Sequence, residues 1–180
     1  SNPWGIDFND YGQAFATACV IPHLYHVIQG ARYHRQAGQH FGDYVYNDIQ
    51  TIADHSHYAG NIGDHAWWGH ENPIQSDTSD AGGGHAHCGA MIYLGDNWPD
   101  RYRNQIFMNN IHGNRVNMDR LVRKGSGYLG RHGDDLLMAN DKWFRGISLR
   151  GGPDGSVYLI DWYDPNACHR VNPEIWDRSN

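Results

Sequence analysis

Residues 144–160 read FRGISLRGGPDGSVYLI and contain the pattern that decides the fold. A short apolar run, a Gly-Pro-Asp-Gly turn and a second run of β-branched and aromatic residues together predict a β-hairpin. The same kind of unit recurs at residues 2–17 and at residues 89–110. Hairpins repeated along one chain are typical of propeller blades, because one blade cannot bury both of its faces. The sequence therefore predicts an all-β fold of the β-propeller type.

The length of the chain limits how much of a propeller it can form. A closed propeller needs at least four blades of about 40–50 residues each, and the chain has 180 residues. We expect one partial propeller domain over residues 1–180, with roughly two to three blades and long loops. Residues 54–84 are predicted to form a His- and Gly-rich insertion loop, and residues 119–142 a Gly-rich loop. Apolar spacing predicts a short helix over residues 43–53.

Charge and cysteine content exclude several classes of protein. A net charge of −6 disfavours a nucleic-acid partner, because phosphate binding needs a basic face. No apolar run approaches the roughly 18–20 residues of a membrane span, so none is expected in this chain. Cys19, Cys88 and Cys168 have no CxxC spacing and define neither a disulfide framework nor a zinc ribbon. The absence of CxxCH from the sequence means that it carries no c-type haem attachment motif.

Histidine is the compositional outlier, with 13 residues. Four of them form two His-x-His pairs, His55 with His57 and His85 with His87. Residues i and i+2 of a strand point to the same face, so each pair can offer two imidazoles to one metal ion. A role in proton transfer and simple hydrogen bonding within a wet loop are the two other interpretations. Candidates for a third metal ligand are Asp54, His65, His70 and His112.

The insertion loop has two further features. The run Gly82-Gly83-Gly84 predicts a close approach of the backbone to a ligand or a strand. It does not match a phosphate-binding loop, because neither GxxxxGK[ST] nor GxGxxG is present. Trp67 and Trp68 lie in polar surroundings and are candidates for contact with a sugar or a planar cofactor. Most of the other aromatic residues are expected to fill interfaces between blades.

Several segments resemble the soluble glucose/sorbosone dehydrogenases. These segments are Asn2-Pro3-Trp4-Gly5, residues 87–107 and residues 144–158. The resemblance implies a six-bladed propeller that binds pyrroloquinoline quinone (PQQ) and calcium. Residues 83–87, GGHAH, and residues 140–146, NDKWFRG, more closely resemble large membrane-bound dehydrogenase-like proteins of planctomycetes and related bacteria. That resemblance implies a haem-binding CxxCH cytochrome domain elsewhere in the parent chain.

The resemblance also implies roles for individual residues. Asn2 and Arg145 match positions beside the cofactor, while Trp143 stands where the sugar dehydrogenases have a second cofactor-contacting arginine. His112 falls near a lysine that contacts the quinone in that family. Ser1 stands where the family has arginine, and the calcium-binding loop is shortened at residues 18–22, which weakens the case for PQQ with calcium. The expected catalytic residues are His87 and His112, the cofactor-binding residues are Asn2, Arg145 and Trp143, and the metal ligands are His85, His87, His55 and His57.

The implied function is part of a sugar or alcohol dehydrogenase-like oxidoreductase in an extracytoplasmic or periplasmic setting. A base would remove the hydroxyl proton while hydride passes to the cofactor, and electrons would pass to a quinone or to the cytochrome c domain of the parent chain. One alternative is a non-catalytic propeller that binds carbohydrate or protein, with Trp67 and Trp68 contacting a glycan. Another alternative is a His-ligated metal site without a quinone.

Overall fold

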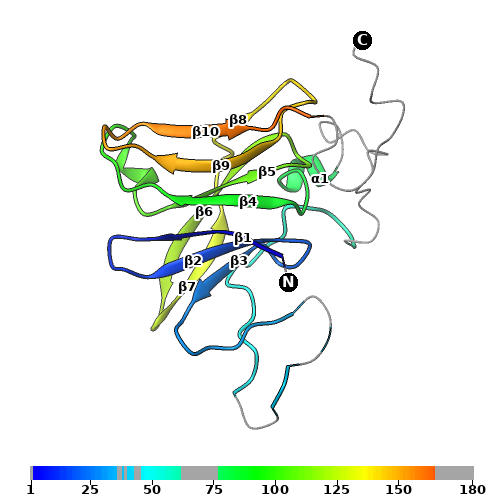
Figure 1. Cartoon of the computed structure of the whole chain (residues 1–180), viewed down its shortest axis with the longest axis vertical. Coiled ribbons are helices and arrows are strands. Elements are labelled where there is room, and N and C mark those ends of the chain that lie inside the picture. Colours follow the sequence, from blue (N-terminus) through cyan, green and yellow to red (C-terminus); the bar gives the residue numbers. More distant parts are fainter. Residues whose placement is uncertain (1, 36–37, 39, 43–45, 62–76, 165–180) are drawn as a thin grey trace.

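The computed structural model describes residues 2–35, 38, 40–42, 46–61 and 77–164. These residues form antiparallel β-sheets, one short helix, α1 (Asp77–Ala81), and a 3-10 turn, η2 (Asp100–Tyr102) (Figure 1). The prediction of an all-β fold class is confirmed, because the described elements are mostly strands in antiparallel sheets and α1 is a single short turn of helix.

The first sheet contains β1 (Asn2–Phe8), β2 (Ala14–Cys19) and β3 (Leu24–Val27), in that order. The turn between β1 and β2 is closed by Asn9, whose side-chain oxygen accepts hydrogen bonds from the backbone N–H groups two and four residues later. Gly12 adopts a φ of 71° there, a conformation that glycine tolerates and most residues do not. The hairpin predicted at residues 2–17 is therefore confirmed, and its turn chemistry explains it.

The second sheet is a meander of four strands with a short fifth strand. It contains β4 (His87–Ile92), β5 (Ile106–Asn110), β6 (Arg115–Lys124) and β7 (Gly127–His132), in that order. The two-residue β8 (Leu137–Met138) pairs with the start of β6. The second sheet therefore contains the hairpin that the sequence predicts at residues 89–110 and extends it.

Strands occupy much of residues 119–142, which the sequence pattern predicts as a Gly-rich loop. β6 continues to Lys124, and its part from Asp119 onward pairs with the whole of β7. Gly125, with a φ of 61°, lies in the tight turn between them. Gly130 lies within β7, where a Cβ would meet the side chain of Leu24 and the backbone of Ala53. These glycines mark a turn and a close approach of another segment, and neither role requires a loop.

The helix predicted over residues 43–53 is not formed in its described part. Residues 46–53 contain no helix, and Ile49 forms a parallel bridge with Tyr33. Further along, Ala53 forms a parallel bridge with Gly130 of β7. Ile49 and Ile52, two of the apolar residues that suggested a helical face, thus belong to an extended segment that runs alongside other strands. The insertion loop predicted over residues 54–84 contains the short helix α1, and its residues 62–76 lie outside the described residues.

The third sheet is the hairpin of β9 (Gly146–Gly151) and β10 (Val157–Asp161). Its turn is closed by hydrogen bonds from the Gly152 N–H to the Ser156 carbonyl, 2.7 Å, and from the Gly155 N–H to the Gly152 carbonyl, 3.1 Å. The Gly-Pro-Asp-Gly signal therefore predicted this hairpin correctly.

The first strands of the three sheets, β1, β4 and β9, lie side by side (Figure 1). A Cβ on Gly5 of β1 would clash with the backbone of Ala90, and one on Gly89 would clash with the backbone of β9. The Asp7 carboxylate accepts a hydrogen bond from the Ile92 N–H at 2.8 Å. Residue numbers rise in the same direction on both strands at these contacts, so β1 and β4 run parallel. Glycine at these contacts lets the backbones approach closely.

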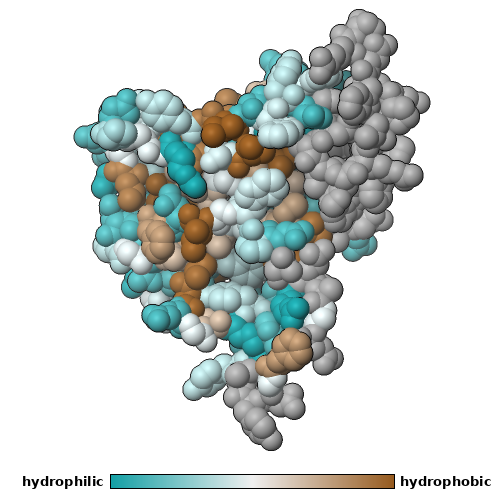
Figure 2. All heavy atoms as spheres, in the orientation of Figure 1, coloured by the Kyte–Doolittle hydropathy of each residue, from teal (hydrophilic) through white to brown (hydrophobic). Residues whose placement is uncertain are grey.

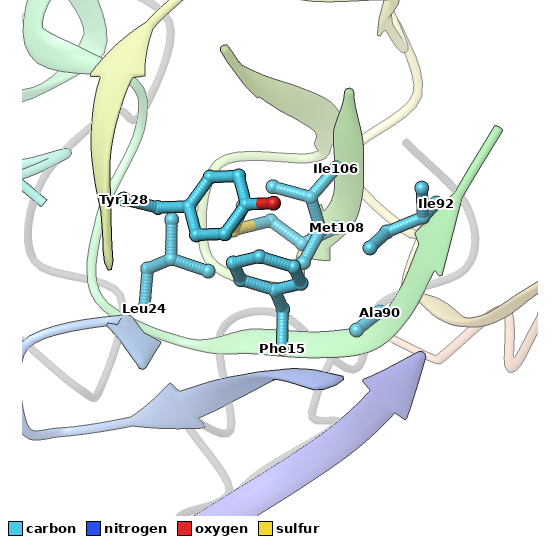
Figure 3. Packing of buried hydrophobic residues seen from close by; sticks show 7 residues of the cluster. All are labelled: Phe15, Leu24, Ala90, Ile92, Ile106, Met108 and Tyr128. Carbon is cyan, nitrogen blue, oxygen red and sulfur yellow. The ribbon is translucent and has the colours of Figure 1, made fainter. Parts of the chain in front are cut away.

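Two hydrophobic clusters cover the two faces of the second sheet. The cluster in Figure 3 fills the space between the first and second sheets with Phe15, Leu24, Ala90, Ile92, Ile106, Met108 and Tyr128. The other cluster lies between the second and third sheets and contains Met91, Tyr93, Phe107, Val116, Met118 and Leu149. Burying one such large apolar side chain contributes about 1.5–3 kcal/mol, so both clusters tie the sheets together.

Apolar side chains also remain exposed at both ends of the row of sheets. They are more than one-third exposed and alternate along β1 and β10. Figure 2 shows hydrophobic atoms gathered over β1 on the face seen there. The exposed residues are Trp4, Ile6 and Phe8 on β1, and Tyr158, Ile160 and the following Trp162 on β10.

Candidate metal centre

A row of buried polar residues lies on one face of β6. Side chains alternate along a strand, so Arg115, Asn117 and Asp119 share this face, while Val116 and Met118 point into the opposite core cluster. The Asp119 side chain has no exposed surface. A carboxylate buried in this way needs compensating partners, because its desolvation is costly.

Three histidines converge on Asp119. His23 comes from the turn between β2 and β3, and its Nε2 lies 2.7 Å from Asp119 Oδ2. His55 Nε2 and His57 Nε2 lie 3.3 Å and 3.4 Å from Asp119 Oδ1. The two Nε2 atoms are 3.1 Å apart. With one ligand atom taken from each of the four residues, all of these atoms lie within 4.8 Å of one another.

The backbone explains why His55 and His57 reach the sheet. The Ile52 N–H donates to the Leu24 carbonyl at 3.0 Å, and the Asp54 N–H donates to the Gly130 carbonyl at 3.0 Å. These bonds fix the segment between β3 and β7. Across the β6–β7 ladder, Asp119 is paired with His132. The segment therefore delivers its two imidazoles to the point where the Asp119 and His132 side chains stand next to each other.

Three ligand atoms form a triangle with the dimensions of a coordination sphere. Metal–ligand bonds of about 2.0–2.1 Å in a tetrahedral site place neighbouring ligand atoms about 3.3–3.4 Å apart. The triangle of His55 Nε2, His57 Nε2 and Asp119 Oδ1 has sides of 3.1, 3.3 and 3.4 Å. Asp119 Oδ1 accepts no hydrogen bond within the described residues. A buried carboxylate oxygen without a hydrogen bond is expensive, and a bound cation would remove that cost.

The second ring nitrogens of two histidines have their own partners. His55 Nδ1 lies 3.1 Å from Asp54 Oδ1, and His57 Nδ1 lies 2.7 Å from His87 Nε2. If each Nδ1 carries the proton and donates it outward, each Nε2 presents its lone pair to the centre. Metal-ligating histidines almost always have such an outer acceptor, which fixes the tautomer and the ring orientation. His87 therefore belongs to the outer shell of this cluster.

The charge states favour a cation as well. Burial opposes ionisation of Asp119, but the charge of His23 and its hydrogen bond to the carboxylate outweigh burial and hold the pKa of Asp119 well below its ordinary value. Burial and the charge of His23 lower the pKa of His57 to about 3. Burial and the charges of His23 and His57 also lower the pKa of His87 well below its ordinary value. Burial opposes protonation of His55, but its contacts with Asp119 and Asp54 outweigh burial and raise its pKa. The centre thus combines a carboxylate with a neutral His57, and His55 gives up its proton when a metal binds.

The glycine run packs directly against the cluster. A Cβ on Gly82 would lie 2.6 Å from Cδ2 of His57, and Gly82 has a φ of 130°. A Cβ on Gly83 would lie 2.7 Å from Cα of Gly113. The Asn117 side-chain amide donates to the Gly82 carbonyl at 3.0 Å, and the Asn110 amide does the same. The predicted close approach of the backbone is confirmed, and its partners are a cluster histidine and the sheet.

A buried arginine supports the outer rim of the cluster. Arg115 donates to Asp135 Oδ2 at 2.8 Å and to the Ser79 side chain at 2.8 Å. Asn117 donates to the other Asp135 oxygen at 2.7 Å. Asp135 Oδ1 in turn lies 3.7 Å from His132 Nε2. This chain fixes Asp135 beside His132, whose ring stacks on that of His55 at a centroid distance of 5.2 Å.

The structure separates the predicted metal ligands into two groups. His55 and His57 lie together in the cluster, and His87 contacts His57 from behind. His85 lies outside the cluster and packs its ring against that of His112, with centroids 4.8 Å apart. His112, a predicted catalytic residue, is therefore next to His85 and not among the cluster residues. The other third-ligand candidates divide as well, because Asp54 holds His55 while His65 and His70 lie outside the described residues.

The predicted cofactor-binding residues lie outside the cluster. Asn2 is exposed at the start of β1. Arg145 donates from its guanidinium to the carbonyls of Lys142 and Phe144, at 2.7 and 2.8 Å. The Trp143 ring lies 5.6 Å from that of Tyr163. The two candidates for glycan contact, Trp67 and Trp68, fall outside the described residues.

The sequence reasoning missed His23 and Asp119 as members of the site. The pattern of residues 115–119, RVNMD, alternates polar and apolar residues, which is the signal of a strand with a polar face. That pattern could have brought Asp119 into consideration. His23 carries no comparable local signal, because its place in the cluster depends on how the first sheet packs on the second.

The donor set does not fit calcium. Calcium takes six to eight oxygen ligands, whereas the four residues of this cluster supply three imidazoles and one carboxylate. Imidazole suits zinc, copper, iron and nickel. The cluster therefore does not provide the calcium site that the resemblance to sugar dehydrogenases implies.

The chain belongs to the family described as a domain of unknown function, DUF7133, which matches residues 1–178. Comparison with curated proteins and with solved structures gave no match. Within the described part of the chain, no helix has the length and apolar character needed to cross a membrane.

Proposed function

We propose that this DUF7133 domain binds one first-row transition-metal ion at the cluster of His23, His55, His57 and Asp119. The observation that carries the proposal is the triangle of two Nε2 atoms and one carboxylate oxygen, with sides of 3.1–3.4 Å around a buried point. Nitrogen-rich ligation favours zinc, iron, copper, nickel or cobalt over calcium and magnesium.

A hydrogen-bonded cluster without a metal explains the geometry less well. Such a cluster would leave Asp119 Oδ1 fully buried and without a hydrogen bond. It would also hold several imidazoles against one another, although the charge of each disfavours protonation of the next. A divalent cation satisfies the carboxylate and both Nε2 lone pairs at once. Its binding free energy also adds to the stability of the folded state.

The test is metal binding by untagged protein that has been stripped with a chelator. Titration with Zn²⁺ or Co²⁺ should give about one tight equivalent per chain, as expected for a single site of this ligand number. Asp119→Asn keeps the shape of the side chain and removes its charge. It should weaken metal affinity by about 100-fold or more, since losing a direct ligand costs more affinity than losing a residue that only contacts a ligand. His34→Ala is the matched control, because His34 is exposed and lies outside the cluster.

Two results would refute the metal site. One is the absence of a tight equivalent with any first-row divalent ion. The other is an affinity that Asp119→Asn and His34→Ala leave equally unchanged, because binding would then come from scattered surface histidines.

The second candidate function is the quinone-dependent sugar or alcohol dehydrogenase that the sequence resemblance implies, built on a six-bladed propeller. What supports it is the placement of β1, β4 and β9, the first strands of three successive antiparallel sheets, next to one another. Inner strands of propeller blades gather around an axis in this way. In this candidate the predicted roles of His87, His112, Asn2, Arg145 and Trp143 stand as proposals, as do the extracytoplasmic location and the cytochrome partner.

Dye-linked dehydrogenase activity of the complete parent protein would test this second candidate. A panel of sugars and alcohols should be assayed with and without added PQQ and calcium. PQQ-dependent dye reduction that is lost in Arg145→Ala would support it. A folded protein that reduces no dye with any of these substrates would refute it and leave the metal proposal untouched.

A further inference from the structure

The exposed fraction of the cluster residues changes in one direction across the site. His57 and Asp119 are fully buried and His23 is nearly so, whereas the side chain of His55 is 17% exposed and that of His132 is 31% exposed. His132 contacts both the partly exposed His55 and the buried His57, because its ring centroid lies 5.2 Å from that of His55 and 4.6 Å from that of His57. Among the described residues of the cluster, solvent therefore reaches the site from the side of His55 and His132.

His23 is placed differently from the other two histidines. Its Nε2 lies 2.7 Å from Asp119 Oδ2, which is a normal length for a hydrogen bond to a carboxylate. It is clearly shorter than the roughly 3.3 Å that separates two ligands on one ion. An Nε2–H that donates to Oδ2 has no lone pair to offer a metal. His23 thus holds the carboxylate from behind while Oδ1 faces His55 and His57.

We infer that the ion has three protein ligands, His55, His57 and Asp119, and that a small monoanion with an oxygen or nitrogen donor completes its coordination on the side of His132. This inference rests on the proposed metal site and makes it more specific. Structural sites in proteins are closed by four protein ligands, whereas sites that act on a substrate have three and keep a position open. The arrangement is accordingly that of a site that exchanges a ligand.

The charge of the site determines which ligand fits. A divalent ion with one carboxylate and two neutral imidazoles leaves one positive charge in a largely buried place, and a buried charge without a partner is costly. A monoanion such as a carboxylate or hydroxide neutralises it. His132 Nε2 is buried, has no hydrogen-bond partner among the described residues and lies 3.7 Å from Asp135 Oδ1. His132 therefore stands beside the open position as a contact residue for the incoming ligand.

The experiment uses azide as the probe and the Co²⁺-loaded chain, whose visible spectrum reports the ligands on the ion. Saturable spectral change with azide is expected in the unmodified protein. His132→Phe should weaken azide binding by about tenfold while Co²⁺ affinity changes little, since His132 is not a ligand of the ion. His132→Gln keeps a hydrogen-bond donor and should restore most of the azide affinity. His23→Asn should lower Co²⁺ affinity by about 10–100-fold, the range for an outer partner of a ligand.

The outcomes separate the two proposals. One tight equivalent of Co²⁺ with no response to azide would overturn this inference and leave the metal site standing. Loss of tight Co²⁺ binding in His23→Asn, to the same extent as in Asp119→Asn, would make His23 a fourth ligand and would also overturn it. A chain that binds no Co²⁺ would refute the metal site, and this inference with it. An azide response that His132→Phe leaves intact would place the open position on another side.

Discussion

The two His-x-His pairs have the same spacing, yet they end in different surroundings. His55 and His57 both face the buried carboxylate of Asp119. His87 stays beside that cluster as a neighbour of His57, while His85 packs against His112. The spacing of two imidazoles is therefore insufficient to make a metal site. What distinguishes the first pair is a carboxylate on β6 that the fold brings opposite to it.

The difference between the pairs is tested most strongly by removing one histidine from each. His57→Ala should weaken Zn²⁺ or Co²⁺ affinity by about 100-fold or more, because it removes a ligand. His85→Ala should leave affinity within about threefold, because the described structure places it outside the cluster. Isothermal titration of the two variants, each first checked for folding by circular dichroism, measures this difference. Equal losses in both variants would mean that the two pairs are equivalent and that Asp119 does not distinguish them.

The stability of the metal-free protein should fall as pH drops below the ordinary histidine pKa of about 6.5. The pKa of His57 is lowered to about 3 and that of His87 is also well below its ordinary value, chiefly through burial. Their stabilising contribution is full above about pH 6.5 and is lost as pH falls, because the unfolded chain binds protons that the folded chain refuses. Each such proton contributes about 1.4 kcal/mol per pH unit.

The neighbours of His57 change the profile above pH 6.5. His57 faces Asp119 and the rings of four other histidines, which are His23, His55, His87 and His132. The pKa of His55 is raised, because its close contacts with the carboxylates of Asp119 and Asp54 outweigh its burial. Its contribution is therefore present below about pH 6.5 and is lost as pH rises. Both effects are measured by the urea concentration at half-unfolding, recorded with a chelator present at pH values from 8 to 4.5. A midpoint concentration that does not decrease as the pH is lowered below 6.5 would contradict the buried neutral state of His57 and His87.

The glycine run offers a smaller and more local test. Gly82→Ala introduces a side chain at a φ of 130°, with its Cβ 2.6 Å from the His57 ring. We expect a loss of about 1–3 kcal/mol of stability together with weaker metal binding. Gly125→Ala is the matched control, because Gly125 also has a positive φ, 61°, but nothing lies within 4 Å of its Cβ. Urea denaturation and metal titration of both variants decide the matter. Metal affinity unchanged in Gly82→Ala would show that this contact does not position His57.

The smallest expected effect concerns His87, the member of the second pair that lies next to the cluster. His87→Ala removes the acceptor for His57 Nδ1 and should weaken metal affinity by about tenfold, the lower end for an outer partner. His112→Ala, the equivalent change beside His85, should have no effect on affinity. Competition with a chromogenic chelator resolves a difference of this size. Unchanged affinity in His87→Ala would remove His87 from the outer shell.

The sequence predicted the local parts of this molecule better than the parts that depend on packing. The turns at Gly12 and at residues 152–155 are determined by their own residues, and these turns predict the hairpins that contain them. The glycines of residues 119–142 suggested a loop, yet Gly130 is required inside a strand by Leu24 and Ala53, which come from distant segments. No local pattern could have indicated that contact.

The same distinction holds for the candidate site. The His55–His57 pair could be picked out by its spacing, and the glycine run next to His85 indicated a close approach. Asp119 could not be recognised because its value as a ligand depends on the register of β6 and on the segment whose Ala53 forms a bridge with Gly130 of β7. His23 depends on the packing of the first sheet against the second.

The most direct measurement is the anomalous diffraction of a crystal of the metal-loaded protein, recorded at the absorption edge of the bound ion. We predict one strong peak within about 2.0–2.2 Å of His55 Nε2, His57 Nε2 and Asp119 Oδ1, with His23 on the far oxygen of the carboxylate. A peak between His85 and His112 or no ordered metal peak within the His55, His57 and Asp119 triangle would contradict the metal site.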